Sequence, residues 1–311
     1  MKKINWTLII IFSMVLACGK KYPLPPEPKT GMPSEESYLV VSNTSWDFTR
    51  FTNLKDIIVG EDGYIYIVDS SSLLKFNVYG DLVDTFRTDL DIPVSCAQDI
   101  SRNIYILEQG AKRISVYTRD KDFLYEIQDT TFGVLRGISV SKDGRIFVSD
   151  SLKDLLLEVD SSGVIDTIAT PGSGILQVDD PMGIFADQER NRILVASMGH
   201  NWVEGISLTE PRYSVNHFGG VTHSGGSDEG FFLRPIDVYA DTSGYIYVAD
   251  YDNYRVQKFN SDSIFIVAVQ FDEKPRSVAV SKDGKYMYVG FKEKVIKLKK
   301  PEIPEQPGGE Q

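Results

Sequence analysis

Cysteine, histidine and long apolar segments are scarce in this sequence. Only two of the 311 residues are cysteines, Cys18 and Cys96, so no more than one intramolecular disulfide could form. Three histidines in total leave little material for a zinc site, which commonly uses three protein ligands. The apolar stretch from Leu8 to Leu16, interrupted by Ser13, is too short to cross a bilayer permanently.

Basic residues are also in deficit. The chain has 33 lysines and arginines against 44 aspartates and glutamates, which gives a formal net charge of -11. Broad affinity for phosphate backbones or anionic lipid surfaces depends on an excess of positive charge. The composition therefore argues against nucleic acid as a partner.

The first eighteen residues have the pattern of an export signal. Lys2 and Lys3 precede the apolar stretch, and Ala17 and Cys18 follow it. The ending Val15-Leu16-Ala17-Cys18-Gly19 resembles the lipobox of bacterial lipoproteins. That resemblance implies cleavage before Cys18 and lipidation of this residue, which would anchor the protein to a membrane. An ordinary signal peptide with an incidental cysteine is the alternative.

The composition of both ends of the chain indicates that they do not belong to the folded domain. We expect a signal peptide over residues 1–17, a proline-rich tether over residues 18–37 and a flexible tail over residues 299–311. Gly19, rather than an acidic residue, follows Cys18. By resemblance to lipoprotein sorting, this favours the outer membrane if the cell has one.

One phrase occurs six times between residues 38 and 298. It consists of an apolar strand, a turn, a second apolar strand that ends in a small or acidic residue, and a third strand. The clearest copy, Arg234 to Phe259, resembles the NHL repeat. The resemblance implies an all-β protein, a six-bladed β-propeller with four-stranded blades. Propellers of this type include protein-binding and RNA-binding modules, lyases and lactonase relatives, so the fold leaves the function open.

Turns and strands inside the repeats agree with that architecture. Asp62-Gly63, Asp143-Gly144 and Asp283-Gly284 predict tight hairpin turns with positive φ angles. Segments such as 64–68 and 245–248 are apolar on both faces, as expected for a sheet packed between two others. Fourth strands are predicted at Leu82–Phe86, Phe123–Ile127, Val164–Ile168, Tyr213–Phe218 and Ile264–Val269.

The last repeat has no fourth strand of its own. After the third strand, at 295–298, the chain continues into Lys299-Lys300-Pro301. The apolar segment Tyr38–Val41 precedes the first repeat without a repeat to belong to. We therefore expect this segment to complete the last blade and close the ring, which removes an exposed strand edge.

Charged residues gather where the first strands begin. In propeller blades the first strand starts, and the second ends, on the same face of the disc, so aligned residues meet at one mouth of the central channel. The candidate ligand-binding residues there are Lys55, Asp56, Arg136, Asp237 and Arg276. They suit a polar or anionic group. A solvated rim without a specific role is the alternative.

The residues that end the second strands are expected to have structural roles. An acidic residue at this position belongs to the repeat itself, and caps a loop or pairs with an arginine of the same repeat, such as Arg113 or Arg255. Cys96 falls at a repeat position otherwise filled by isoleucine or valine, so we expect it in the core. The residues that end the second strands are Asp69, Glu108, Asp150, Ser197, Asp250 and Phe291.

Two longer connections are expected on the same face, over residues 197–202 and 218–232. Both are polar and rich in glycine, a composition that is common in functional loops and also in ordinary connectors. His200 and Trp202 lie in the first of them. Trp202 is the candidate contact residue, because an exposed aromatic side chain favours a binding role.

Two functions follow from these observations. The first is a non-enzymatic cell-envelope binding module, which engages a protein, peptide or glycan through the loop-rich face and needs no cofactor. The second is a metal-dependent hydrolase or lyase, similar to the lactonases, with its site at the channel mouth. It would require calcium or zinc, for which Asp56, Asp237 and Glu108 are the candidate ligands, with His200 beside them.

Overall fold

The computed structural model describes residues 37–41, 46, 50–220 and 225–301. Cys18, the export signal, most of the tether and residues 302–311 lie outside the described residues, so what the sequence indicates for them stays a prediction. Ser34–Gln311 form one compact unit, which is described here by itself. In the part of the chain that is described, no helix has the length and apolar character needed to cross a membrane.

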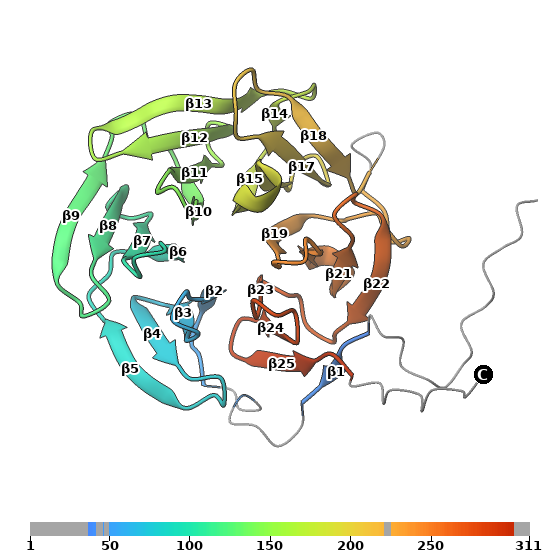
Figure 1. Ribbon diagram of the computed structural model, residues 1–311, viewed down its shortest axis with the longest axis horizontal. Helices are drawn as coiled ribbons and strands as arrows, with labels where there is room; N and C mark the ends of the chain where they lie inside the picture. Colours follow the sequence, from blue (N-terminus) through green and yellow to red (C-terminus); the bar gives the residue numbers. More distant parts are fainter. Residues whose placement is uncertain (1–36, 42–45, 47–49, 221–224, 302–311) are drawn as a thin grey trace, which may run out of the picture. The chain divides into compact units, whose positions relative to one another are not determined.

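Six antiparallel sheets are arranged as the blades of a β-propeller (Figure 1). The innermost strands surround the central channel and the fourth strands form the outer rim. The first strands are β2 (Leu54–Val59), β6 (Pro93–Gln98), β10 (Leu135–Val140), β15 (Pro181–Asp187), β19 (Pro235–Ala240) and β23 (Ser277–Val280). The second strands are β3 (Ile65–Asp69), β7 (Ile104–Glu108), β11 (Ile146–Asp150), β16 (Arg192–Ser197), β20 (Ile246–Asp250) and β24 (Tyr286–Gly290).

The outer half of each blade follows the same order. The third strands are β4 (Ser72–Phe76), β8 (Arg113–Tyr117), β12 (Leu155–Asp160), β17 (Trp202–Ser207), β21 (Arg255–Phe259) and β25 (Val295–Lys299). The fourth strands are β5 (Leu82–Arg87), β9 (Phe123–Gln128), β13 (Gly163–Pro171), β18 (Ser214–Phe218), β22 (Phe265–Gln270) and β1 (Leu39–Val40). Two short 3-10 turns, η2 (Gln188–Arg190) and η3 (Tyr251–Asn253), follow β15 and β20. The six-bladed all-β prediction is confirmed.

The hydrophobic core lies between neighbouring blades. Second strands are buried along almost their whole length, because each is covered by a sheet on both sides. One cluster, for example, joins Leu107 and Ile114 of the second blade to Leu135 and Val148 of the third. The expectation that these segments are apolar on both faces is therefore confirmed.

The N-terminal strand closes the ring. β1 pairs antiparallel with β25, with Leu39 opposite Lys299 and Val40 opposite Leu298, and it lies beside β25 in Figure 1. Tyr38, which precedes β1, is 6% exposed and its hydroxyl donates to the carbonyl oxygen of Gly284 at 2.6 Å. The predicted completion of the last blade by this segment is confirmed.

Blade three departs from the prediction. β13 is longer than expected, and a short strand, β14 (Gln177–Val178), pairs parallel with its end.

The hairpin turns also differ in detail from the prediction. In each Asp-Gly turn only the glycine has a positive φ angle, for example +78° at Gly63. The aspartate has another part in the turn: the Asp62 carboxylate accepts a hydrogen bond from the amide of Tyr64.

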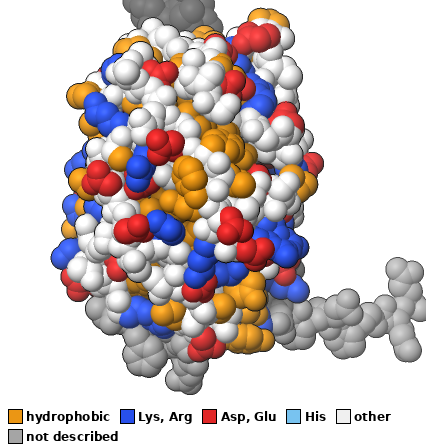
Figure 2. Space-filling model, turned by 90° about the vertical axis from the view of Figure 1, so that its left-hand side faces the viewer, with side chains coloured by type: hydrophobic (Ala, Val, Ile, Leu, Met, Phe, Trp, Pro, Cys, Tyr) orange, Lys and Arg blue, Asp and Glu red, His pale blue; other side chains and the backbone are white. Residues whose placement is uncertain are grey.

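The outer rim has a mixed surface. Seen from the left-hand side of Figure 1, it carries charged side chains of both signs around apolar ones (Figure 2). Exposed apolar side chains occur on the outer strands, among them Leu82, Val83, Phe123 and Leu124. The ion pair of Lys121 with Asp84 links the turn before β9 to the neighbouring outer strand β5.

Candidate functional site

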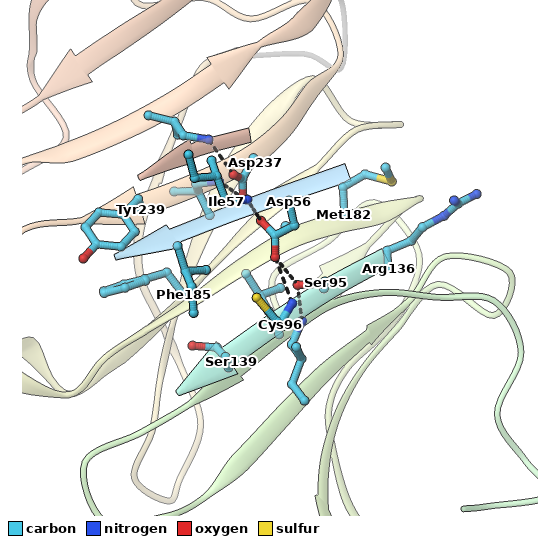
Figure 3. A pocket seen from close by; sticks show the side chains of 18 of the residues that line it. Asp56, Ile57, Ser95, Cys96, Arg136, Ser139, Met182, Phe185, Asp237 and Tyr239 are labelled. Atoms are coloured by element: carbon cyan, nitrogen blue, oxygen red, sulfur yellow. Dashed lines mark hydrogen bonds between the residues drawn. The ribbon is translucent and has the colours of Figure 1, made fainter. Parts of the chain in front are cut away.

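The central channel holds a cavity of about 530 Å³. Its walls come from the first strands of all six blades, and its size lies within the range typical of small-molecule sites. Arg136 and Met182 lie toward one end of this cavity, Phe185, Tyr239 and Ser139 toward the other, and Asp56 between them (Figure 3). We call the end with Lys55, Arg136 and Arg276 the channel mouth, and the end with Phe185 and Tyr239 the far end.

A β-bulge near the start of the first strand recurs in five blades. The pairing of first and second strands shifts register there, as between Leu54 and Asp56 in the first blade. A bulge brings two successive residues to the same side of a strand. Lys55 and Asp56 both line the cavity, as do Ile236 and Asp237.

Three cations lie at the channel mouth without an ion-pair partner. Within the described ranges, no carboxylate lies within 4.0 Å of the side-chain nitrogens of Lys55, Arg136 or Arg276. Arg136 donates to the Ser151 hydroxyl at 3.1 Å, and Arg276 to the Asn53 side chain at 2.8 Å. The guanidinium groups thus donate to neutral partners and form no ion pair, although Asp180 lies near enough to Arg136 for their charges to interact.

The pKa of Lys55 is lower than its usual value, because the side chain is partly buried and lies near two other cations. Burial lowers it first, and the positive charges of Arg276 and Arg136 lower it further. A bound anion would offset both effects, because it would supply the missing counter-charge in a partly buried place. The structure therefore brings together the three predicted cations, and their arrangement suits an anionic group.

Asp56 and Asp237 lie one layer deeper and are joined through a serine. The Ser277 hydroxyl lies 2.9 Å from Oδ1 of Asp56 and 2.8 Å from Oδ2 of Asp237. A hydroxyl has one hydrogen and can donate to only one of them. The arrangement is satisfied when one carboxyl carries a proton and donates to Ser277. Burial and then the charge of Asp56 raise the pKa of Asp237 to about 8, and burial raises the pKa of Asp56.

These two carboxylates also join neighbouring blades through backbone amides. Asp56 accepts from the amide of Cys96 at 3.0 Å and from the Ser95 hydroxyl at 2.7 Å, both on the next blade. Asp237 accepts from the amide of Val278 at 2.8 Å. Each carboxylate also accepts from the amide of the residue that follows it in the chain. The prediction placed them correctly at the channel, but their oxygens are mostly occupied by the protein itself.

The residues that end the second strands mostly have the structural role that was expected. Asp69 accepts from the amides of Thr52 and Asn53, and Asp150 from those of Gly133 and Val134, so each caps the approach to its own blade. Asp250 pairs with Arg255 at 2.8 Å. Cys96 is buried, in agreement with the core position expected for it, and burial raises its thiol pKa.

Glu108 belongs to the same group and does not reach the channel. Its fully buried carboxylate pairs with Arg113 at 2.9 Å and accepts from Ser115 and from the amide of Asp91. Burial alone would raise its pKa, but the hydrogen bonds from Arg113 and Ser115 lower it below its usual value. Glu108 does not line the cavity and lacks free oxygens for a metal beside Asp56 or Asp237.

His200 and Trp202 are not surface residues. Trp202 is 4% exposed and opens β17, where its ring lies between the rings of His200 and His217, with centroids 4.2 and 4.1 Å away. His200 is 2% exposed and contacts the Ser197 hydroxyl at 3.0 Å. The expectation of an exposed contact residue is wrong, because the loop folds inward and its aromatic residues complete the core of blade four.

The donors around Asp56 and Asp237 do not fit a metal site. The carboxylate oxygens of Asp56 and Asp237 accept hydrogen bonds from amide and hydroxyl groups. A metal ion could bind these oxygens only if the hydrogen bonds were broken. Within the described residues, no group of three or more His, Cys, Asp or Glu side chains is placed to hold a metal ion. The calcium or zinc of the enzymatic alternative has no ligand set among the residues named for it.

Comparison with known proteins agrees with this architecture. The family model of the NHL repeat matches residues 232–259, which span the first three strands of blade five. This chain is a six-bladed β-propeller that contains an NHL repeat. A comparison with curated proteins gives no match to this NHL-repeat protein.

Solved structures similar to this NHL-repeat propeller share its fold at low identity. A gluconolactonase from Xanthomonas campestris is 12% identical, with 83% of this chain and 89% of that chain covered and a TM-score of 0.66. A streptogramin B lyase is 13% identical, with 84% of this chain and 96% of that chain covered and a TM-score of 0.59. A chain of a nidogen/laminin complex is 14% identical, with 73% of this chain and 85% of that chain covered and a TM-score of 0.60. Such identities show the fold alone, and the fold serves enzymes and protein assemblies alike.

Some residues of the cavity were not predicted. Phe185 and Tyr239 form the far end, where their ring centroids lie 4.6 Å apart. Each follows the position predicted to open its strand, Gly183 or Asp237, by two residues. Because residues two apart share a face of a strand, the alternation could have indicated both rings.

Proposed function

We propose that this protein is a non-enzymatic binding module of the cell envelope, which holds an anionic group of its partner at the channel mouth. One observation carries the proposal: three cations converge at the opening of the channel cavity without an ion-pair partner among the described residues. Partly buried cations of this kind bind anions more strongly than solvated surface lysines do. The partner class is a protein, peptide or glycan with an acidic group.

The envelope location rests on the sequence of the N-terminal segment. A lipid on Cys18 would place the propeller at a membrane surface, at the end of the proline-rich tether. The net charge of -11 supports a partner that is recognised at one local cationic site rather than by general attraction. Nucleic acid is not proposed for the same reason.

The enzymatic alternative has one observation in its favour, the likeness of fold to a gluconolactonase and a streptogramin B lyase. At 12% and 13% identity this likeness does not extend to a site. The carboxylates that such a site would use here accept hydrogen bonds from the neighbouring blades. We therefore favour the binding module.

A thermal-unfolding experiment tests the proposal. Inorganic phosphate, sulfate and an acidic hexapeptide are each added to the purified full-length chain, with sodium chloride at matched ionic strength as the reference. A ligand at ten times its Kd stabilises the folded state by about 1.4 kcal/mol. For a domain of this size that corresponds to a rise in Tm of about 3–6 °C.

Two variants assign the effect to the channel mouth. The double variant Lys55→Gln/Arg136→Gln should abolish the rise in Tm. Lys292→Gln is the matched control, since Lys292 is exposed, pairs with Glu293 and does not line the cavity. No stabilisation beyond the sodium chloride reference, or an equal effect in the double variant, would contradict the proposal.

A further inference from the structure

The channel mouth presents both cationic and apolar side chains. Arg276, Lys55 and Arg136 come from blades six, one and three, whereas the equivalent positions of blades two, four and five are Val94, Met182 and Ile236. A ligand with charge alone would leave these apolar side chains in contact with water. The mouth is therefore complementary to a group that is anionic on one side and apolar on the other.

Below the mouth, the walls carry both polar and apolar side chains. The oxygens of Asp56 are occupied there, because they accept hydrogen bonds from Ile57, Ser95, Cys96 and Ser277. Aliphatic side chains line the same part of the wall, and Ile57, Ile138, Ile184 and Val278 are among them. A ligand that passes this layer gains by burying apolar surface.

The far end is aromatic, and its cations are already paired. The rings of Phe185 and Tyr239 pack against each other at an angle of 49°. Lys282 forms an ion pair with Glu61, and Lys142 with Glu189. Among the described residues that line the cavity, the cations without an ion pair lie at the mouth, so the two ends give the channel a direction.

We infer that the ligand of this channel is a small amphipathic organic anion, with its charged head at Lys55, Arg136 and Arg276 and its apolar body extended toward Phe185 and Tyr239. The inference rests on the proposed function, since it uses the same cations. It narrows the partner to a molecule that enters the cavity of about 530 Å³, or to a segment of that size on a larger partner.

A homologous series of carboxylates measures the contribution of the apolar body. Acetate, butyrate, hexanoate and octanoate are titrated into the full-length protein by calorimetry, together with octanol as the uncharged match of octanoate. Each buried methylene is expected to tighten binding about two- to fourfold. Octanoate should bind at least about tenfold more tightly than octanol, as one charge-assisted contact suggests.

Variants separate the head from the body. Lys55→Gln/Arg136→Gln should weaken octanoate at least about tenfold, and Lys292→Gln should leave its affinity unchanged. Phe185→Ala should weaken octanoate and leave butyrate unaffected. If Phe185→Ala does not fold, Tyr239→Leu serves the same purpose, and the ligand series itself needs no variant.

The outcomes distinguish the inference from the proposal beneath it. If acetate and octanoate bind equally, and both depend on Lys55 and Arg136, the amphipathic ligand is wrong and the anion site stands. If octanol binds as well as octanoate and the double variant changes nothing, both are wrong. Absence of binding by the whole series and by phosphate also overturns both.

Discussion

The hydroxyl oxygen of Ser277 lies 2.8 Å from Oδ2 of Asp237, across the boundary between blades six and five. The same hydroxyl lies 2.9 Å from Asp56 on blade one. Three blades therefore meet through one hydroxyl group and two carboxyl groups. Since the single hydroxyl hydrogen cannot serve both carboxylates, the folded protein gains by keeping an additional proton there.

This proton makes stability depend on pH. Asp237 has a pKa of about 8 in the folded protein, raised by burial and by the charge of Asp56, against about 3.9 in an unfolded chain. A raised carboxyl pKa means that the folded state holds a proton that the unfolded state releases. The stabilisation is complete below about pH 4 and is lost as the pH rises toward 8.

We expect the free energy of unfolding to fall between pH 5 and pH 8.5, by up to about 1.4 kcal/mol per pH unit. Asp237→Asn cannot titrate, so its slope should be clearly smaller, although the loss of one amide hydrogen bond makes it less stable at pH 5. Urea unfolding at several pH values measures both slopes. Asp262→Asn, at an exposed turn, is the control. Equal slopes for wild type and Asp237→Asn would refute the shared proton.

Glu108 and Glu126 provide a test of the buried ion pair, because both approach Arg113, at 2.9 and 3.5 Å. Glu108 is fully buried and Glu126 is 41% exposed. Glu108→Gln should lower the free energy of unfolding by about 2–4 kcal/mol, and Glu126→Gln by less than about 1 kcal/mol. Chemical denaturation measures both. Similar losses in the two variants would mean that burial does not determine the strength of this pair.

The stability of the ring closure can be measured at Tyr38. Its ring packs edge-on against Tyr247, and the two hydroxyl oxygens lie 2.9 Å apart. Tyr38→Ala should cost about 3–4 kcal/mol, whereas Leu39→Ala, whose side chain is 49% exposed, should cost less than about 1 kcal/mol. Thermal unfolding checks the difference. A Tyr38→Ala protein as stable as wild type would mean that the closing strand contributes little.

Gly183 allows β15 and β19 to approach each other at the channel. A Cβ atom there would lie 2.2 Å from Oδ1 of Asp237 and 2.7 Å from its Cα atom. Gly183→Ala should therefore destabilise the fold by about 2–3 kcal/mol, because backbone atoms cannot move aside easily. Gly226→Ala, whose nearest contact would be 3.1 Å, is the control, with an expected cost below about 1 kcal/mol. Denaturation midpoints compare the two.

The repeats made the fold accessible from sequence. Each copy contains the same order of strands, so the six copies support one another, and the unpaired segment at 38–41 could be matched to the incomplete last blade. β14 escaped prediction because its two residues carry no periodicity. The local pattern determines a strand, but it does not determine an added pairing at the outer edge.

The site was accessible only in part. The cations Lys55, Arg136 and Arg276 could be placed at one mouth from their repeat positions alone. The position of Trp202 could not be predicted, since the polar residues around it in the sequence suggest exposure. Its ring packs against two histidines, and only the folded structure shows this contact. The roles of Asp56 and Asp237 depend on contacts between blades, which repeat alignment does not describe.

The order of synthesis gives the strand pairing of the last blade a kinetic consequence. Of the described strands, β1 leaves the ribosome first and its partner β25 last, with 260 positions between Leu39 and Lys299. Contacts so distant in sequence form late, after a large loss of chain entropy. Each of blades one to five is built from strands that are consecutive in the sequence. The sixth blade needs β23, β24 and β25 from the C-terminal end and β1 from the N-terminal end. We therefore expect the docking of β1 on β25 to be a late step of folding, before which the outer edge of β25 is open to other chains.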